Sequence, residues 1–155
     1  MLKPRSLQHE YSLIYSEDCA LKLPTGETER ETALRVARQT GKWSELTLQG
    51  ETPTVFQVLP MTGTQFSYLG SEQVRKGLLQ MEVYELAIRL VLRSIANFGD
   101  HKVTHSIVEG HQIAGRATID ALYAIGETPA MGRAVIAELG EIIISHASDG
   151  ISPLA

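Results

Sequence analysis

Cysteine is nearly absent from the sequence, and this scarcity excludes one way of stabilising the fold. Cys19 is the single cysteine among 155 residues, so no disulfide can form within the chain. Such cysteine usage suits a reducing compartment. The stability must therefore come from a packed core, for which this length and a hydrophobic fraction of 43% are sufficient.

Long runs of one kind of residue are also absent. The 14 Lys and Arg residues are interspersed with 18 Asp and Glu residues, and the net charge of −4 leaves no basic patch typical of nucleic-acid binding. The apolar stretches are too short and too interrupted to cross a bilayer, and no apolar segment follows the basic start of the chain, so a signal peptide is not expected. We therefore expect neither a nucleic-acid partner nor a membrane association.

The hydrophobic pattern predicts an α+β fold, with one domain over residues 32–147. Residues 46–48 and 54–59 are the best strand candidates, because the second, TVFQVL, is rich in β-branched and aromatic residues and is bounded by prolines. The turn QGET connects the two segments, which predicts an antiparallel hairpin.

Helices are expected to cover this small sheet. A helical period over 71–98, with Val74, Leu78 and Leu79 among its apolar positions, predicts one long amphipathic helix. Shorter helices are predicted over 31–39, 117–125 and 129–145. Residues 104–108 are compatible with either a strand or a helix.

Residues 1–31 are interpreted as an extended N-terminal arm, and residues 148–155 as a flexible tail. Within the arm, SLIY at 12–15 has the composition of a short strand. An arm that cannot bury itself often docks on a partner. Tyr11, Ile14 and Tyr15 are therefore candidates for an interface.

The aromatic residues after the arm allow two interpretations. Trp43 is the only tryptophan, and packing in the core is favoured over a role at an interface. Phe66 and Tyr68 have the same core interpretation. All three are kept as interface candidates, because aromatic side chains also dominate binding surfaces.

The segment HKVTHSIVEGH is the strongest candidate for chemistry. His101 and His105 could share a metal ion if the segment were helical, and His111 would be a third ligand. The first histidine is not followed by the glutamate of the HExxH metalloprotease motif, and the β-branched residues between them disfavour a helix. A metal site is therefore not expected, and a metal-dependent enzyme using these histidines is kept as an alternative.

Other catalytic patterns do not occur in the sequence. Cys19 has no adjacent base, the Gly-x-Ser-x-Gly elbow is missing, and no glycine-rich phosphate loop is present. Glu82 and Glu85 are expected on the solvated face of the long helix. We therefore predict no catalytic residue and no cofactor, and expect that the chain is not an enzyme.

The order of these segments resembles small bacteriophage morphogenesis proteins. In that family a turn and a short hairpin with a Pro-Thr-x-Phe core precede helices, and Glu-Leu-Gly lies near the end. The matching residues are Thr40, Gly41, Trp43, Gly50, Pro53, Thr54, Phe56, Pro60, Glu138, Leu139 and Gly140. They span about two-thirds of the chain, and Leu59 stands where many such proteins have a basic residue.

The resemblance implies a non-enzymatic assembly protein similar to tail assembly chaperones. Its expected partners are phage structural proteins and further copies of itself, in the bacterial host cytoplasm during assembly and possibly in the virion. A subunit of the head–tail connector and a small regulator that binds a host protein are alternatives.

Overall fold

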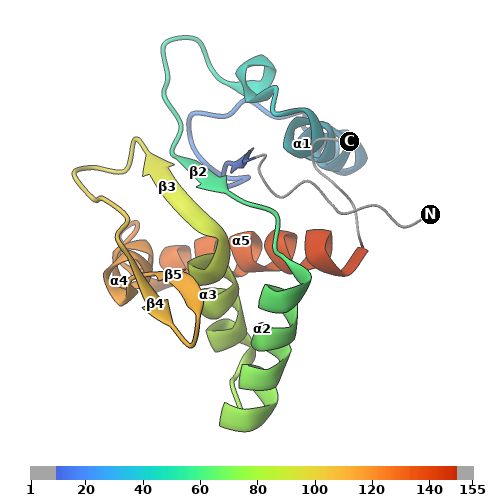
Figure 1. The fold of residues 1–155 in the computed structure, drawn as a ribbon. Coiled ribbons are helices and arrows are strands. Elements are labelled where there is room, and N and C mark those ends of the chain that lie inside the picture. The colour runs from blue at the N-terminus through green and yellow to red at the C-terminus, as the bar shows by residue number, and fades with distance from the viewer. Residues whose placement is uncertain (1–9, 150–155) are drawn as a thin grey trace.

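The central sheet joins three strands that lie far apart in the sequence. In the computed structural model, which describes residues 10–149, β1 (Tyr11–Leu13) and β3 (Leu92–Ala96) flank β2 (Val55–Val58) in an antiparallel sheet. A second antiparallel pair consists of β4 (His105–Val108) and β5 (His111–Ala114). The helices are α1 (Glu27–Thr40), α2 (Gly63–Lys76), α3 (Gln80–Val91), α4 (Arg116–Tyr123) and α5 (Pro129–Asp149). The predicted α+β class is confirmed (Figure 1).

Strand β2 directs alternate side chains into the main core. Phe56 and Val58 are buried, whereas Gln57 between them is partly exposed, as the period of two in a strand requires. Phe56 lies opposite Leu13 of β1 and Ile95 of β3. One buried aromatic ring thus lies at the centre of all three strands.

Helix α5 packs closely on α3 and α4 because two of its positions are glycine. A Cβ atom at Gly140 would lie 2.5 Å from the Cβ of Tyr84 in α3. At Gly132 it would lie 2.6 Å from the backbone carbonyl of Tyr123 in α4. Figure 1 shows α5 running below the three-stranded sheet, and Ile136 and Leu139 of α5 are fully buried in the same core.

Helix α1 packs on a separate, smaller cluster. Its buried residues are Ile14, Leu34, Ala37 and Trp43. Trp43 begins a short 3₁₀ helix, Trp43–Leu46, and its indole Nε1 donates a hydrogen bond to the Ser12 carbonyl at 3.0 Å. The tryptophan therefore ties the second cluster to β1, and the core interpretation of Trp43 is confirmed.

The prediction of one long helix over 71–98 is wrong. Gly77 adopts a left-handed conformation, with φ 60°, and ends α2; α3 then begins after Leu79. Helix α2 also begins earlier than predicted, after Thr62, whose hydroxyl accepts a hydrogen bond from the Gln65 amide at 3.0 Å. The segment after Val91 is the strand β3, because it pairs with β2. Both helices bury apolar faces, so their combined pattern resembles that of one helix.

The predicted hairpin between residues 46–48 and 54–59 is also wrong. β2 is a strand, but its partners are β1 and β3. Leu46 ends the 3₁₀ helix, and Thr47 forms an isolated bridge with Leu21. Gly50, with φ 81°, turns the chain between residues 46–48 and 54–59, but these two segments do not pair as strands.

The described part of residues 1–31 is not a separate extended arm. The strand composition at 12–15 corresponds to β1, which pairs with β2, and α1 already begins at Glu27. Leu13 and Ile14 are fully buried, because β1 covers one edge of the sheet. Residues 1–9 of the predicted arm and 150–155 of the predicted tail lie outside the described residues.

The remaining helix predictions are confirmed. The segments 31–39, 117–125 and 129–145 correspond to α1, α4 and α5, and residues 104–108 are resolved as β4. Among residues 10–149, none of the helices combines the length and apolarity that crossing a membrane requires.

The glycine contacts of α5 predict an unusual effect of adding a methyl group. Gly132→Ala should lower the free energy of unfolding by about 1–3 kcal/mol, because the new Cβ meets backbone atoms that cannot rotate away. Gly70→Ala in α2 is the matched control, since its Cβ would meet no atom within 4 Å. It should stabilise the protein by about 0.4–1 kcal/mol. Urea unfolding followed by circular dichroism measures both, and a stabilising Gly132→Ala would contradict the packing described.

Candidate functional site

The three histidines of the segment 101–111 have different partners. His101 Nε2 lies 2.8 Å from the Thr118 hydroxyl, and His105 Nε2 lies 2.8 Å from the Leu92 carbonyl. His111 stacks on Tyr68 with 4.4 Å between ring centroids. Among residues 10–149, no group of three or more His, Cys, Asp or Glu side chains is positioned to hold a metal ion. The structure therefore does not bring these histidines together as a ligand set.

Most of the predicted interface residues lie inside the fold. Tyr11, Ile14, Tyr15 and Trp43 are buried, and they pack in the two clusters described above. Their apolar surface is already buried by packing within the chain, because β1 belongs to the sheet.

Phe66 and Tyr68 both belong to α2 and remain accessible. Phe66 is 41% exposed, and Tyr68 is partly buried against the core and stacks on His111. These two are the predicted interface residues that the fold leaves available to a partner.

A more strongly exposed apolar surface lies where the α2–α3 turn approaches the β4–β5 turn. We call it the apolar rim, formed by Val74, Leu79, Ile107 and Val108. The first three are 86%, 72% and 70% exposed. The two turns are joined by an ion pair of 3.2 Å between Arg75 and Glu109.

A groove of about 290 Å³ opens beside the apolar rim. Val108 and Leu78 supply part of its lining, together with the carboxylate of Glu72. The side chain of Glu72 is buried and accepts hydrogen bonds from Lys76, at 2.8 Å, and from Arg75. The hydrogen bond from Lys76 is the main cause that keeps the pKa of Glu72 below its usual value. Glu72 is therefore a fixed negative charge at neutral pH and not a proton donor.

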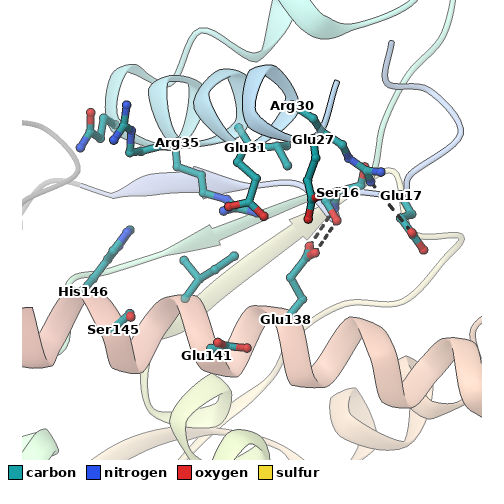
Figure 2. Close-up of a pocket in the computed structure, with 14 residues that line it drawn as sticks. Ser16, Glu17, Glu27, Arg30, Glu31, Arg35, Glu138, Glu141, Ser145 and His146 are labelled. Carbon is teal, nitrogen blue, oxygen red and sulfur yellow. Dashed lines mark hydrogen bonds and ion pairs between the residues drawn. The ribbon is translucent and has the colours of Figure 1, made fainter. Parts of the chain in front are cut away.

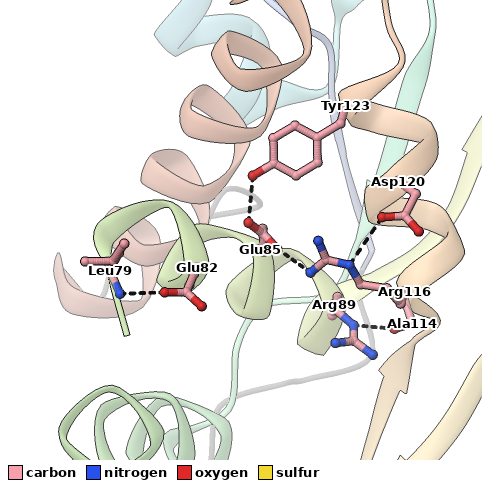
Figure 3. Close-up of polar contacts among 8 residues, drawn as sticks. All are labelled: Leu79, Glu82, Glu85, Arg89, Ala114, Arg116, Asp120 and Tyr123. Atoms are coloured by element: carbon pink, nitrogen blue, oxygen red, sulfur yellow. Dashed lines mark hydrogen bonds and ion pairs between the residues drawn. The ribbon is translucent and has the colours of Figure 1, made fainter. Parts of the chain in front are cut away.

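The groove is also lined by a second buried carboxylate, that of Glu85. Figure 3 shows it between Arg116, whose Nη1 donates at 2.5 Å, and Tyr123, whose hydroxyl donates at 2.6 Å. Arg89 donates from Nε to the Ala114 carbonyl at 2.8 Å and ties α3 to β5. Glu85 is 8% exposed, so the expectation that it lies on a solvated helix face is wrong.

A cleft of about 650 Å³ lies between α1 and α5. Figure 2 shows Glu27 and Glu31 of α1 facing Glu138 and Glu141 of α5 across it. At one end the Ser16 amide donates to Glu138 Oε2 at 2.8 Å, and the Ser16 hydroxyl donates to Oε1. These two contacts link α5 to the segment that leads to α1.

Charged groups in this cleft are less completely paired than those of the groove. Arg38 lines the cleft together with Glu31 and Glu138, and its Nε is buried without a hydrogen-bond partner among residues 10–149. Burial is the main cause that lowers the pKa of Arg38, and the two carboxylates oppose this shift. The cleft thus holds buried charge in a geometry that leaves room for another polar occupant.

Comparison with models of known protein families, with curated proteins and with solved structures finds no match.

Two residues of the apolar rim escape prediction because the helical period over 71–98 places them in a helix core. Val74 and Leu79 fit the apolar period of the predicted helix over 71–98. Gly77 ends the helix between them, so neither side chain faces the core. Glycine between two apolar residues is the available signal, because a left-handed glycine commonly ends a helix. Ile107 carries no comparable signal, since a strand of four residues has no clear period.

The burial of Tyr123 predicts a late ionisation of its phenol. Burial and the hydrogen bond to Glu85 raise the pKa of Tyr123 to about 12 from a usual value of 10.0. The folded state thus holds this proton more tightly, so its stabilising effect is complete below pH 10 and is lost between about pH 10 and 12.

Phenolate absorbance during alkaline titration measures this ionisation. The difference between the wild-type and Tyr123→Phe titrations should have its midpoint near pH 12. Glu85→Gln should shift that midpoint only part of the way down, because burial remains. A difference midpoint near pH 10 would contradict the contact between Tyr123 and Glu85.

Proposed function

We propose that the chain is a non-enzymatic protein that acts through protein–protein contacts. The observation that carries this proposal is the apolar rim, where three large apolar side chains are at least 70% exposed at one end of the molecule. Exposed apolar patches of this kind mark binding surfaces, because their transfer out of water on association is favourable.

The groove beside the rim supports binding more than chemistry. The carboxylates of Glu72 and Glu85 are held by Lys76, Arg75, Arg116 and Tyr123, so their lone pairs are largely occupied. Fixed charges next to an apolar rim select the partner and its orientation, while burial of the rim supplies affinity. Such an arrangement suits recognition of a protein surface.

The particular role that we propose is that of a phage assembly protein of the tail-assembly-chaperone kind. The resemblance to small phage morphogenesis proteins motivates this assignment. Its residues Phe56, Leu139 and Gly140 lie in the core, so they concern the fold. The partner contacts must therefore come from surface residues, and we assign them to the apolar rim, with phage structural proteins and a second copy of the chain as partners.

Substitution of the rim tests the proposal. The triple variant Val74→Gln, Leu79→Ser and Ile107→Thr removes the apolar surface. Each change should alter the free energy of unfolding by no more than about 0.5 kcal/mol, because the side chains are exposed. Val36→Ser is the matched control, since Val36 is 46% exposed but belongs to α1.

Native mass spectrometry of the untagged chain, co-expressed with phage structural proteins, gives the readout. The wild type and Val36→Ser should form a complex or a symmetric oligomer that the triple variant does not form. Particle yield of the phage should fall with the triple variant alone. If the triple variant binds its partners as the wild type does, or if a host protein is bound and particle yield is unchanged, the proposal fails.

A further inference from the structure

Strand β4 has one edge that faces away from β5. The two positive φ angles in the turn between these strands, 51° and 82°, are those of a type I′ turn, whose flanking residues exchange hydrogen bonds. The Gly115 amide donates to the Thr104 carbonyl at 2.9 Å in the same alternation. The backbone groups of every second residue from Thr104 therefore face β5, and those of His105 and Ile107 face outward.

The outward backbone groups of β4 are less covered than the carbonyls of the other strands. In β1, β3 and β5 a side chain donates a hydrogen bond to a backbone carbonyl, and the acceptors are Ser12, Leu92 and Ala114. Among residues 10–149, no side chain or backbone group forms such a bond with the outward groups of His105 and Ile107. Their hydrogen-bonding capacity is therefore available to another chain.

The sequence of β4, HSIV, does not protect this edge. Folded proteins usually blunt a free edge with lysine, proline or a bulge. β4 contains neither residue, and it pairs with β5 in a continuous register. Ser106, Ile107 and Val108 are exposed, and the last two belong to the apolar rim. The edge thus combines available backbone groups with apolar side chains, which is the combination that accepts an added strand.

We propose that this edge pairs antiparallel with β4 of a second copy of the chain. The proposal rests on the proposed role of the apolar rim as a contact surface. A two-fold axis at Ser106 places Ile107 of each copy opposite His105 of the other, so that the outward amides and carbonyls exchange hydrogen bonds. The two hairpins then form one continuous sheet, which is more stable than an isolated pair of strands.

The charges beside the edge favour a second copy as the occupant. The same register brings the turn of one copy, which contains Glu109, beside the segment before β4 of the other, which contains Lys102. Lys102 is exposed and forms no ion pair among residues 10–149, and the side chain of Glu109 is 52% exposed despite its ion pair with Arg75. β4 itself carries no acidic or basic residue apart from His105. The edge is therefore complementary to itself.

Disulfide trapping tests the register. Ser106 lies opposite its own copy in a pair without hydrogen bonds, where the Cα atoms are about 4.5 Å apart, a distance that permits a disulfide. In a Cys19→Ser background, which removes the exposed native cysteine, Ser106→Cys should form a covalent dimer in a glutathione redox buffer. Gln112→Cys in the same background is the matched control. Gln112 is exposed on β5 and would lie about 14 Å from its copy, three strand spacings away, so it should form no such dimer.

Two substitutions of Ile107 separate the backbone edge from the side chain. Ile107→Thr removes apolar surface and keeps the outward amide. Ile107→Pro removes both, but it leaves the bonds to β5 intact because this amide faces away from β5. In sedimentation equilibrium of the untagged chain, Ile107→Pro should raise the dissociation constant of the dimer about tenfold more than Ile107→Thr. Far-UV circular dichroism checks that both variants fold, and trapping at position 106 decides if the proline variant does not.

A wild type that stays monomeric would overturn the proposal, as would equal trapping at positions 106 and 112 or equal dissociation constants of the two Ile107 variants. Equal dissociation constants would leave the proposed function intact, because they would assign association to the side chains of the apolar rim. A monomer that still binds phage structural proteins would likewise overturn only the pairing of β4.

Discussion

The fold depends on β2 being paired along both of its edges. Phe56 is buried between Leu13 and Ile95, and this pairing requires the chain after Val91 to be extended. Because β3 ends at Ala96, the residues after it leave the sheet and form the β4–β5 hairpin beside α2. The exposed position of Ile107, and with it the apolar rim, is therefore a consequence of how β2, about 50 residues earlier, pairs with its neighbouring strands.

The sequence predicts the local elements better than their partners. The helix at 31–39 and the strand within TVFQVL follow from patterns of a few residues, and both are present. The partners of β2 depend on residues about 40 positions away, which no local pattern identifies. Turn residues between 48 and 53 favoured the nearer segment instead, and a shared apolar face concealed the break at Gly77.

The candidate sites were harder to predict than the fold, for a related reason. Glu85 is buried because Arg116 and Tyr123, more than 30 residues later, supply its hydrogen bonds. Its neighbours in the sequence give no sign of this. Conversely, Tyr11 and Trp43 are aromatic residues of the kind common at interfaces. Both are nevertheless buried in the core of this fold. Whether an aromatic or charged residue is accessible is decided by tertiary contacts.

The order in which the strands occur has a consequence for synthesis on the ribosome. β1 is made first, but the strand that it pairs with ends at Val58, and the other neighbour of that strand ends at Ala96. At about 5–20 residues per second, the buried residues of β1 wait for several seconds before the sheet can close. Throughout this interval Leu13 and Ile14 remain exposed on the nascent chain, where a chaperone that binds short apolar segments can reach them before the protein has folded.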